Sequence, residues 1–307
     1  MKLSIIIPLL DEEKTITQLY KRLISSLKKD FKKFKYEIIF VDDGSSDKTF
    51  QILKKLHNKD KNLKIIQFSR NFGHHLALTA GIDYATGDYI VMMDGDLQDK
   101  PEEIINLYKK LKKGYDIVYA RRMNKNFGVG KKISSFLFNK LISFLADKKI
   151  VINSTVFRIF TKQVAREVKQ MRESNRYLLG LFGWVGFRHA IQKVGHGKRF
   201  GGKTKYSMSR QIELAFNAII SFSDYPLKLI TKIGFFFVFL SVLMIFYILI
   251  KKLIYNTPIV GWSSLIFSIF AIGGIQIILL GVIGEYLGRS YMESKKRSLY
   301  VIKNLLS

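Results

Sequence analysis

Short apolar runs alternate with amphipathic stretches over the first 120 residues of the chain. Runs typical of buried strands occupy residues 3–9, 36–41, 63–68, 89–93 and 116–120. Apolar side chains at helical spacing fill the intervals, at residues 16–27, 48–56, 75–85 and 101–113. Because strands that alternate with helices form βαβ units, the pattern predicts an α/β fold with a mostly parallel sheet.

Acidic loops follow three of these predicted strands. They contain Asp11, Asp42 with Asp43, and Asp94 with Asp96. The carboxyl ends of parallel strands meet at one edge of such a sheet, where ligands bind, so we expect the carboxylates to converge. Asp94, Asp96 and the amide of Gln98 offer oxygen donors of the kind that Mg²⁺ uses together with substrate phosphates. Taken by itself, such a motif more often belongs to a solvated acidic loop, but its position at the end of a predicted buried strand favours the metal-binding interpretation.

Two uncharged apolar stretches dominate the last third of the chain, residues 233–250 and 259–284. A helix of about 20 apolar residues crosses a bilayer, so the two stretches are predicted to form a transmembrane hairpin. Before them, residues 211–229 carry apolar side chains at helical spacing until Pro226 interrupts the pattern. This predicts a helix that lies at the membrane interface.

The two ends of such a hairpin lie on the same side of the membrane. Lysine and arginine residues in the tail and before the first stretch place that side in the cytoplasm, although Lys251 and Lys252 in the connecting loop oppose this orientation. Glu285 and Arg289 are four residues apart on the second predicted helix and are expected to pair. Glycines in this helix permit close packing, within the hairpin or between the subunits of a homo-oligomer.

The formal net charge of +27 requires a polyanionic neighbour. Nucleic acid, anionic lipid and phosphorylated substrates all qualify. The apolar stretches and acidic strand ends do not fit a nucleic-acid-binding protein, so we assign the charge to an anionic membrane surface. The chain has no cysteine, which excludes disulfides and thiol chemistry. His74 and His75 are expected to begin a helix near the pocket rather than to bind zinc.

Residues 193–210 form the most basic loop, which is rich in glycine and contains Arg199, Lys203 and Lys205. Such a loop can fold over phosphate groups, because its backbone approaches them closely and its cations neutralise them. From the residues alone, a flexible solvated loop is an equal interpretation.

Several motifs together resemble family 2 glycosyltransferases of the GT-A fold. They are IIIPLLDEE at 5–13, VDDGSSD at 41–47, SRNFGH at 69–74 and MDGDLQD at 93–99. Two more, RFGGKTKY at 199–206 and GVIGEYLGR at 281–289, resemble more narrowly the polyprenyl-phosphate glycosyltransferases. That group includes bactoprenol glucosyltransferases, dolichol-phosphate mannose synthase and the undecaprenyl-phosphate aminoarabinose transferase. The resemblance covers nearly the whole chain.

The resemblance implies a domain order and a set of residue roles. A GT-A catalytic domain would occupy residues 1–210, interface helices 211–231, two transmembrane helices 232–290 and a cytoplasmic tail 291–307. The residues implied to bind the nucleotide are Pro8, Leu10, Glu12, Val41, Asp43, Asp94 and Gly95. Those implied to hold Mg²⁺ or Mn²⁺ are Asp94, Asp96 and Gln98. Those implied to grip donor or acceptor phosphates are Arg122, Arg199, Lys203 and Lys205, and the implied catalytic set is Asp96, Arg122 and Asn153.

The implied reaction is the inverting transfer of a sugar from a nucleotide-diphosphate sugar to undecaprenyl or dolichyl phosphate. The implied location is the inner (cytoplasmic) membrane, with several passes and with the catalytic domain and both termini in the cytoplasm. The product would be a lipid-linked sugar for modification of a cell-envelope glycan. Members of the group usually work with a flippase and a second transferase, so such partners are expected here.

The sequence departs from the family pattern at two places. Relatives often carry Asp-x-Gly-Asp-Phe-Arg where residues 153–158 read NSTVFR, so both acids are absent. Either the chain needs no general base or it is not an active transferase. A phosphate monoester is mostly dianionic at pH 7, and a nucleophile without a proton needs no base, so we expect activity with Asn153 or Ser154 positioning the acceptor. Lys203 stands where relatives often carry an acid, which makes its loop more basic.

Two alternative functions stay open at this point. A processive polysaccharide synthase belongs to the same enzyme class but usually has more membrane spans. A catalytically impaired scaffold or regulator that binds nucleotide sugar or lipid phosphate would explain the missing acids, whereas Asp94, Asp96 and Gln98 argue against it. Metal-dependent hydrolysis of the donor would separate the scaffold from the enzyme.

Overall fold

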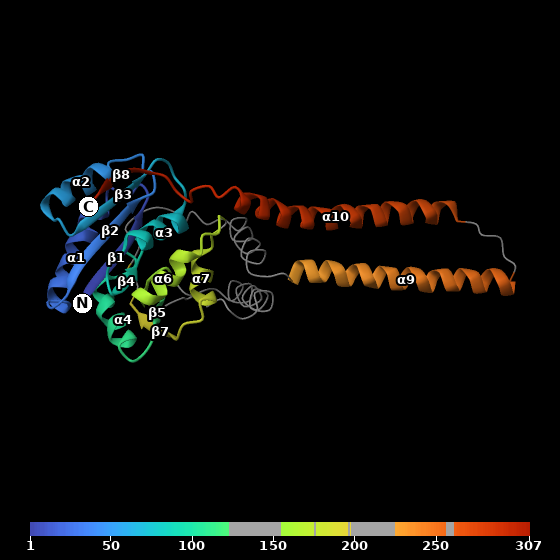
Figure 1. Ribbon diagram of the computed structural model, residues 1–307, viewed down its shortest axis with the longest axis horizontal. Helices are drawn as coiled ribbons and strands as arrows, with labels where there is room; N and C mark the ends of the chain where they lie inside the picture. The colour runs from blue at the N-terminus through green and yellow to red at the C-terminus, as the bar shows by residue number, and fades with distance from the viewer. Residues whose placement is uncertain (123–154, 175, 196, 198–224, 256–260) are drawn as a thin grey trace. The chain divides into compact units, whose positions relative to one another are not determined.

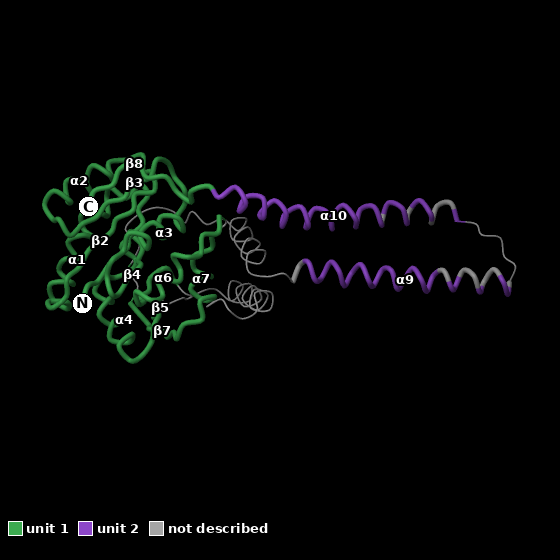
Figure 2. Tube along the Cα trace, viewed as in Figure 1, with its two compact units in different colours: residues 1–218, 297–307 green, residues 219–296 purple. Residues whose placement is uncertain are grey.

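The computed structural model describes residues 1–122, 155–174, 176–195, 197, 225–255 and 261–307. The chain divides into two compact units, residues 1–218 with 297–307, and residues 219–296 (Figure 2). The basic stretch 198–210 and the first part of the predicted interface helix, 211–224, lie outside the described residues.

An eight-stranded mixed sheet forms the centre of the first unit (Figure 1). Its strands are β1 (Lys2–Leu9), β2 (Lys35–Asp42), β3 (Leu63–Phe68), β4 (Tyr89–Met92), β5 (Ile117–Arg122), β6 (Arg158–Thr161), β7 (His189–Val194) and β8 (Ile302–Leu306). Their order across the sheet is β7-β5-β6-β4-β1-β2-β3-β8. Strands β4, β1, β2 and β3 are parallel neighbours and β5 is parallel to β7, whereas β6 and β8 run antiparallel to their neighbours.

Helices cover both faces of the sheet, which explains why β1 is almost entirely apolar. They are α1 (Ile16–Asp30), α2 (Thr49–Lys59), α3 (His74–Tyr84), the 3-10 turn η1 (Pro101–Glu103), α4 (Ile104–Leu111), α6 (Lys162–Gln170) and α7 (Leu178–Trp184). Ile5 and Ile7 belong to one buried cluster together with the apolar faces of α1 and α4. Ile6 points the other way, against α3, where any side chain at Gly81 would overlap its Cγ2 atom.

The predicted α/β fold with a parallel centre is confirmed. Most predicted strands and helices of the first 120 residues agree with the structure to within three residues at each end. The predicted strand 116–120 runs instead from Ile117 to Arg122, and the helix predicted at 101–113 begins as η1 and ends at Leu111. The pattern does not predict β6, β7 or β8, and β8 makes part of the predicted tail an edge strand of the sheet.

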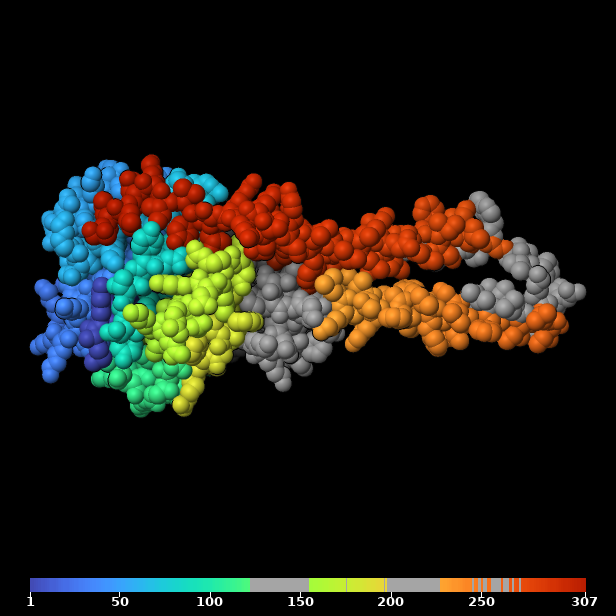
Figure 3. All heavy atoms as spheres, viewed as in Figure 1, coloured from blue at the N-terminus to red at the C-terminus, as the bar shows by residue number. Residues whose placement is uncertain are grey.

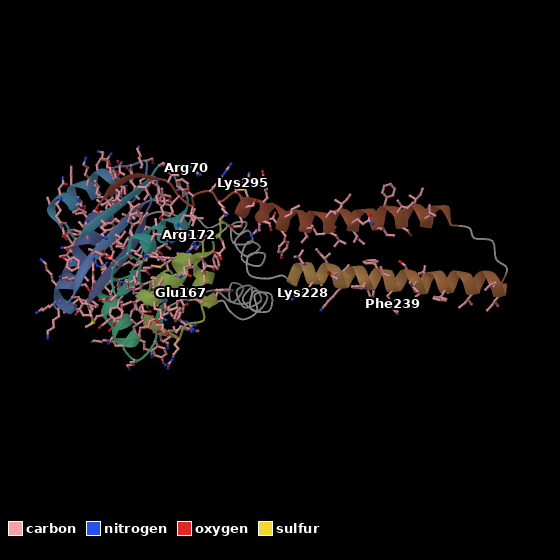
Figure 4. All side chains as sticks on the ribbon, in the orientation of Figure 1. Arg70, Glu167, Arg172, Lys228, Phe239 and Lys295 are labelled. Atoms are coloured by element: carbon pink, nitrogen blue, oxygen red, sulfur yellow. The ribbon has the colours of Figure 1, made fainter. Side chains whose placement is uncertain are left out.

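Two long helices make up the described part of the second unit, α9 (Tyr225–Tyr255) and α10 (Trp262–Ser294). Both are long and apolar enough to cross a membrane. Many of their large apolar side chains are exposed: Phe239 on α9, labelled in Figure 4, is 62% exposed, and Leu287 on α10 is 68% exposed. Figure 3 draws all atoms of α10 in orange to red. Residues 225–231, predicted as interface helix, are the first turns of α9. Arg289 Nε donates a hydrogen bond to Glu285 Oε1 at 3.0 Å, which confirms the predicted pair.

Candidate functional site

Strands β1, β2 and β4 end at the same edge of the sheet, and this brings their acidic loops together. Leu9 pairs with Asp42 across β1 and β2, and Ile6 pairs with Met92 across β1 and β4. The backbone N–H of Asp43 then donates to Leu9 O at 2.9 Å. The predicted convergence of the three loops is therefore confirmed.

The loops after β1 and β2 are locked together by hydrogen bonds. Asp11 has a positive φ of 55°, and its Oδ1 accepts from the backbone N–H of Ser46 at 2.8 Å. Ser45 Oγ accepts from the backbone N–H of Asp11 at 3.0 Å, and Asp42 Oδ1 accepts from the N–H of Ser45. These two acids thus fix the shape of the loops, which is a structural role.

The carboxylate of Asp43 holds the loop that follows β3. Asp43 is almost fully buried, and its Oδ1 accepts from the backbone N–H of Phe72 at 2.7 Å. The backbone N–H of Gly73 donates to Asp43 Oδ2 at 3.0 Å. Burial raises the pKa of Asp43, although these two amide hydrogen bonds and nearby His74 act in the opposite direction.

Glycine is required at position 44 for this contact between loops. Gly44 has a φ of +74°, a conformation that side-chain-bearing residues rarely adopt. A Cβ atom there would lie 2.5 Å from the carbonyl carbon of Arg70 and 2.6 Å from the nitrogen of Asn71. The loop after β3 therefore packs directly on the backbone of the loop after β2.

The Asp94-Gly95-Asp96 turn is fixed by its own neighbours. The backbone N–H of Asp94 donates to Asp99 Oδ2 at 3.2 Å, and that of Gln98 donates to Asp96 Oδ1 at 3.1 Å. A Cβ atom on Gly95 would lie 3.3 Å from Pro8 O and overlap the side chain of Leu9. Gly95 therefore lets the two aspartates approach the end of β1.

His74, the first residue of α3, reaches the same turn. Its Nε2 lies 3.4 Å from Asp94 Oδ1, an ion pair only when the imidazole is protonated. Burial, together with the charges of His74 and Arg158, lowers the pKa of the adjacent His75 to about 4. The expectation that the two histidines begin a helix near the pocket is confirmed.

A buried arginine lies on β6, the strand beside β4. Arg158 has no exposed surface, and its guanidinium carbon lies 4.9 Å from the ring centroids of both Tyr119 and Phe182. Its Nη2 donates to Thr155 O at 2.7 Å and its Nε to Val156 O at 3.1 Å. Burial lowers the pKa of Arg158 to about 10, which leaves the guanidinium charged at neutral pH.

The oxygen donors of this edge fit a hard divalent cation that also binds substrate phosphate. Within the described ranges, no three His, Asp or Glu side chains are arranged to hold a metal ion by themselves. Asp94, Asp96 and Gln98 offer carboxylate and amide oxygens on one short turn. Mg²⁺ is commonly held by only one or two carboxylates, with phosphate oxygens and water as the other ligands.

Comparison with known proteins identifies the family. The family model described as Glycosyl transferase family 2 matches residues 4–169, more than half of the chain. The chain belongs to glycosyl transferase family 2. Its α/β fold with a mixed sheet is GT-A-like, as predicted.

Full-length relatives of this glycosyltransferase share both of its units. YkcC, an uncharacterized glycosyltransferase of Bacillus subtilis (strain 168), is 41% identical, and the match covers 98% of this chain and 93% of YkcC. The bactoprenol glucosyl transferase of Shigella phage SfV is 36% identical, with 99% of each chain covered. Among solved structures, a mycobacterial protein matches with a TM-score of 0.50 at 21% identity, covering 73% of this chain and 76% of that one. This last similarity concerns the fold alone.

The described residues of the glycosyltransferase include the whole of the predicted nucleotide and metal sets. Pro8 pairs with Val41 across β1 and β2, and Val41 is fully buried. Leu10 and Glu12 lie in the loop between β1 and α1, where the Glu12 carboxylate accepts from Thr15 Oγ1 at 2.6 Å. Asp43, Asp94, Gly95, Asp96 and Gln98 lie on the loops described above.

The predicted phosphate-binding residues are described only in part. Arg122 is the last residue of β5, where its backbone pairs with Val194 of β7. Asn153, Arg199, Lys203 and Lys205 lie outside the described residues. Sequence reasoning did not single out Arg158, although an arginine followed by the apolar Ile159 and Phe160 is the kind of signal that could have indicated a buried cation.

Proposed function

We propose that this glycosyltransferase moves a sugar from a nucleotide-diphosphate sugar to a polyprenyl phosphate such as undecaprenyl phosphate. The observation that carries the proposal is the similarity, over 99% of both chains, to a bactoprenol glucosyl transferase. That match extends through the two long apolar helices, which a lipid-linked acceptor would explain. With a divalent cation bound, the acidic edge of the sheet would supply a place for the nucleotide diphosphate.

In this proposal, the donor lies across the carboxyl ends of β1, β2 and β4. Asp43 would face the base or ribose, beside Pro8, Leu10, Glu12 and Val41. Asp94, Asp96 and Gln98 would hold Mg²⁺ or Mn²⁺ against the diphosphate. The bound cation would neutralise the charge that develops on the leaving group.

The cationic residues would act on the phosphates. Arg122 with Arg199, Lys203 and Lys205 would grip the diphosphate or the acceptor. An oxygen of the lipid phosphate attacks the anomeric carbon of the sugar, and the bond from that carbon to the diphosphate oxygen breaks. The nucleoside diphosphate leaves with the bonding electron pair, and the configuration inverts. Since a phosphate dianion carries no proton to remove, Asn153 would position it without acting as a base.

The membrane assignment belongs to the same proposal. Helices α9 and α10 would cross the inner (cytoplasmic) membrane, with the catalytic unit and both termini in the cytoplasm. The net charge of +27 suits an anionic membrane surface. A flippase and a second transferase would use the lipid-linked sugar. The glycines of α10 would allow two copies of the chain to associate through this helix.

The competing candidate is a binder that has lost catalysis, which the missing acids at 153 and 156 favour. The test supplies the full chain in detergent with undecaprenyl phosphate and a panel of radiolabelled UDP- and GDP-sugars, with Mg²⁺, Mn²⁺ or chelator. Label in the lipid phase that disappears with chelator supports the transferase and identifies the sugar. Nucleotide binding without label in lipid, and without hydrolysis of the donor, would support the binder instead.

A further inference from the structure

The C-terminal segment of the chain, residues 297–307, returns to the catalytic sheet. Its strand β8 pairs antiparallel with β3 at the edge of the sheet, with Ile65 opposite Leu306 and Gln67 opposite Asn304 (Figure 1). The pairing shifts register at the end of β3, where the backbone N–H of Ser69 donates to Val301 O at 3.0 Å. This segment therefore reaches the first residue of the loop that Asp43 holds.

Tyr300 fixes the segment through its hydroxyl group. The hydroxyl donates to Asp83 Oδ2 at 2.8 Å, and Asp83 also accepts from Arg172 Nη1 at 2.8 Å. Asp83 lies near the end of α3 and Arg172 follows α6, where Figure 4 labels it. Tyr300 is therefore tied to two helices that pack on the catalytic sheet.

The ring of Tyr300 starts a chain of contacts that ends at Asp43. It stacks on Phe68, the last residue of β3, with ring centroids 5.0 Å apart and an interplanar angle of 18°. Phe68 meets Phe72 edge to face at 5.5 Å. The backbone N–H of Phe72 donates to Asp43 Oδ1 at 2.7 Å. Arg70 covers the ring of Phe72, with its guanidinium carbon 4.1 Å from the centroid.

We propose that Tyr300 is a positioning residue for the nucleotide pocket, acting through Phe68 and Phe72 on Asp43. The inference rests on the proposed role of Asp43 in binding the donor nucleotide. The loop 69–73 has no strand or helix of its own, so its shape depends on what packs against each side. Gly44 and Asp43 hold it from within the pocket, and Tyr300 with Val301 holds it from the edge of the sheet. Loss of the outer support should lower the fraction of molecules whose pocket is ready for nucleotide.

The proposal gives the C-terminal segment a role in donor binding and none in acceptor binding. Tyr300 and Val301, which support the outer side of this loop, come shortly after helix α10 in sequence. The segment that follows the apolar helix pair therefore also supports the donor pocket. Among the described residues, Arg122 at the end of β5 is not part of this contact chain. We therefore expect a change at Tyr300 to weaken donor binding and to leave acceptor binding unaltered.

The experiment compares Tyr300→Ala and Tyr300→Phe with Lys303→Ala, a matched control on the exposed face of β8. Affinity for UDP and for GDP is measured by calorimetry on the full chain in detergent, and KM values for donor sugar and lipid phosphate follow for whichever nucleotide binds. Tyr300→Ala should weaken nucleotide binding and raise the donor KM roughly 2- to 10-fold, the factor expected for loss of one aromatic pair. The kcat and the KM for lipid phosphate should stay within about 2-fold. Tyr300→Phe, which keeps the stacked ring, should have the smaller effect.

A double-mutant cycle with Phe72→Leu tests the contact chain itself and covers the case in which Tyr300→Ala does not fold. Phe72→Leu should raise the donor KM on its own, and the double variant should be no worse than the poorer single variant, because both changes break one chain. The inference is overturned if the double variant raises the donor KM by the product of the two single-variant factors. It is also overturned if both single variants are active and leave the donor KM unchanged. A wild-type chain that binds neither UDP nor GDP overturns the proposed function instead.

Discussion

Glu37 is the buried charge whose contribution to stability can be worked out most directly. Its carboxylate lies on β2, away from the acidic edge, and has almost no exposed surface. It accepts hydrogen bonds from Ser4 Oγ at 2.5 Å and from the backbone N–H of Thr86 at 2.7 Å. Lys2 Nζ lies 2.8 Å and Lys64 Nζ 3.0 Å from Oε2. This network joins β1, β2 and β3.

The pKa of Glu37 gives the magnitude. Burial alone would raise it, but the hydrogen bonds from Lys2, Ser4, Thr86 and Lys64 lower it from 4.5 to about 2. One pKa unit corresponds to about 1.4 kcal/mol, so the ionised carboxylate contributes about 3 kcal/mol to the free energy of unfolding. Because the pKa is lower in the folded chain, this contribution is fully present above a pH of about 4.5 and is lost as the pH falls towards about 2.

The assay follows the thermal unfolding midpoint of the full chain in detergent between pH 3 and pH 7.5. Glu37→Gln should be less stable than wild type by up to about 3 kcal/mol at pH 7, and the difference should shrink steadily below pH 4.5. The control Glu167→Gln removes a partly exposed carboxylate paired with Arg166 and should change little at any pH. Wild-type and Glu37→Gln curves that stay parallel down to pH 3 would refute the reasoning.

Three further substitutions test the site. Gly44→Ala should destabilise the chain by at least about 1 kcal/mol and weaken nucleotide binding, because Gly44 has a positive φ and lies against the backbone of Arg70. Thermal unfolding measures the stability and calorimetry the nucleotide affinity, and unchanged values of both would contradict the packing described. Asp96→Asn should lower the initial rate of sugar transfer with Mg²⁺ roughly 100-fold or more if it holds the cation, whereas a rate within about 2-fold of wild type removes that role. Arg158→Met should lower the free energy of unfolding by about 1–3 kcal/mol, because the carbonyls of Thr155 and Val156 lose their hydrogen-bond donor. A denaturation midpoint equal to that of wild type would contradict this stabilising role of Arg158.

The sequence pattern predicts the parts of the fold that depend on local periodicity. The parallel centre of the sheet and the convergence of the loops after β1, β2 and β4 follow from the alternation of strands and helices and from where each strand ends. Strand β8 depends on pairing with β3, more than 200 residues earlier in the chain, and no local pattern in residues 302–306 specifies that partner. The short strand β6 is not predicted either, because it depends on antiparallel pairing with β4 and β5, which lie earlier in the chain.

The individual roles of acidic residues are equally hard to predict from sequence. Asp11 and Asp43 both follow apolar strands, yet Asp11 accepts a hydrogen bond from the loop after β2, whereas Asp43 accepts hydrogen bonds from the loop after β3. Glu37 falls within a predicted strand, and its four partners come from β1, β3 and the turn after α3. Such assignments depend on contacts between segments that are distant in sequence, which local composition does not encode.

The most direct test of the account is transfer of labelled sugar to undecaprenyl phosphate by the purified full chain. The reaction is run with Mg²⁺ or Mn²⁺ across the UDP- and GDP-sugar panel, with Asp96→Asn and chelator as parallel controls. The account predicts label in the lipid phase for one donor, lost both with chelator and in the variant. Absence of lipid-linked label with every donor, in a preparation that still binds nucleotide, would contradict it.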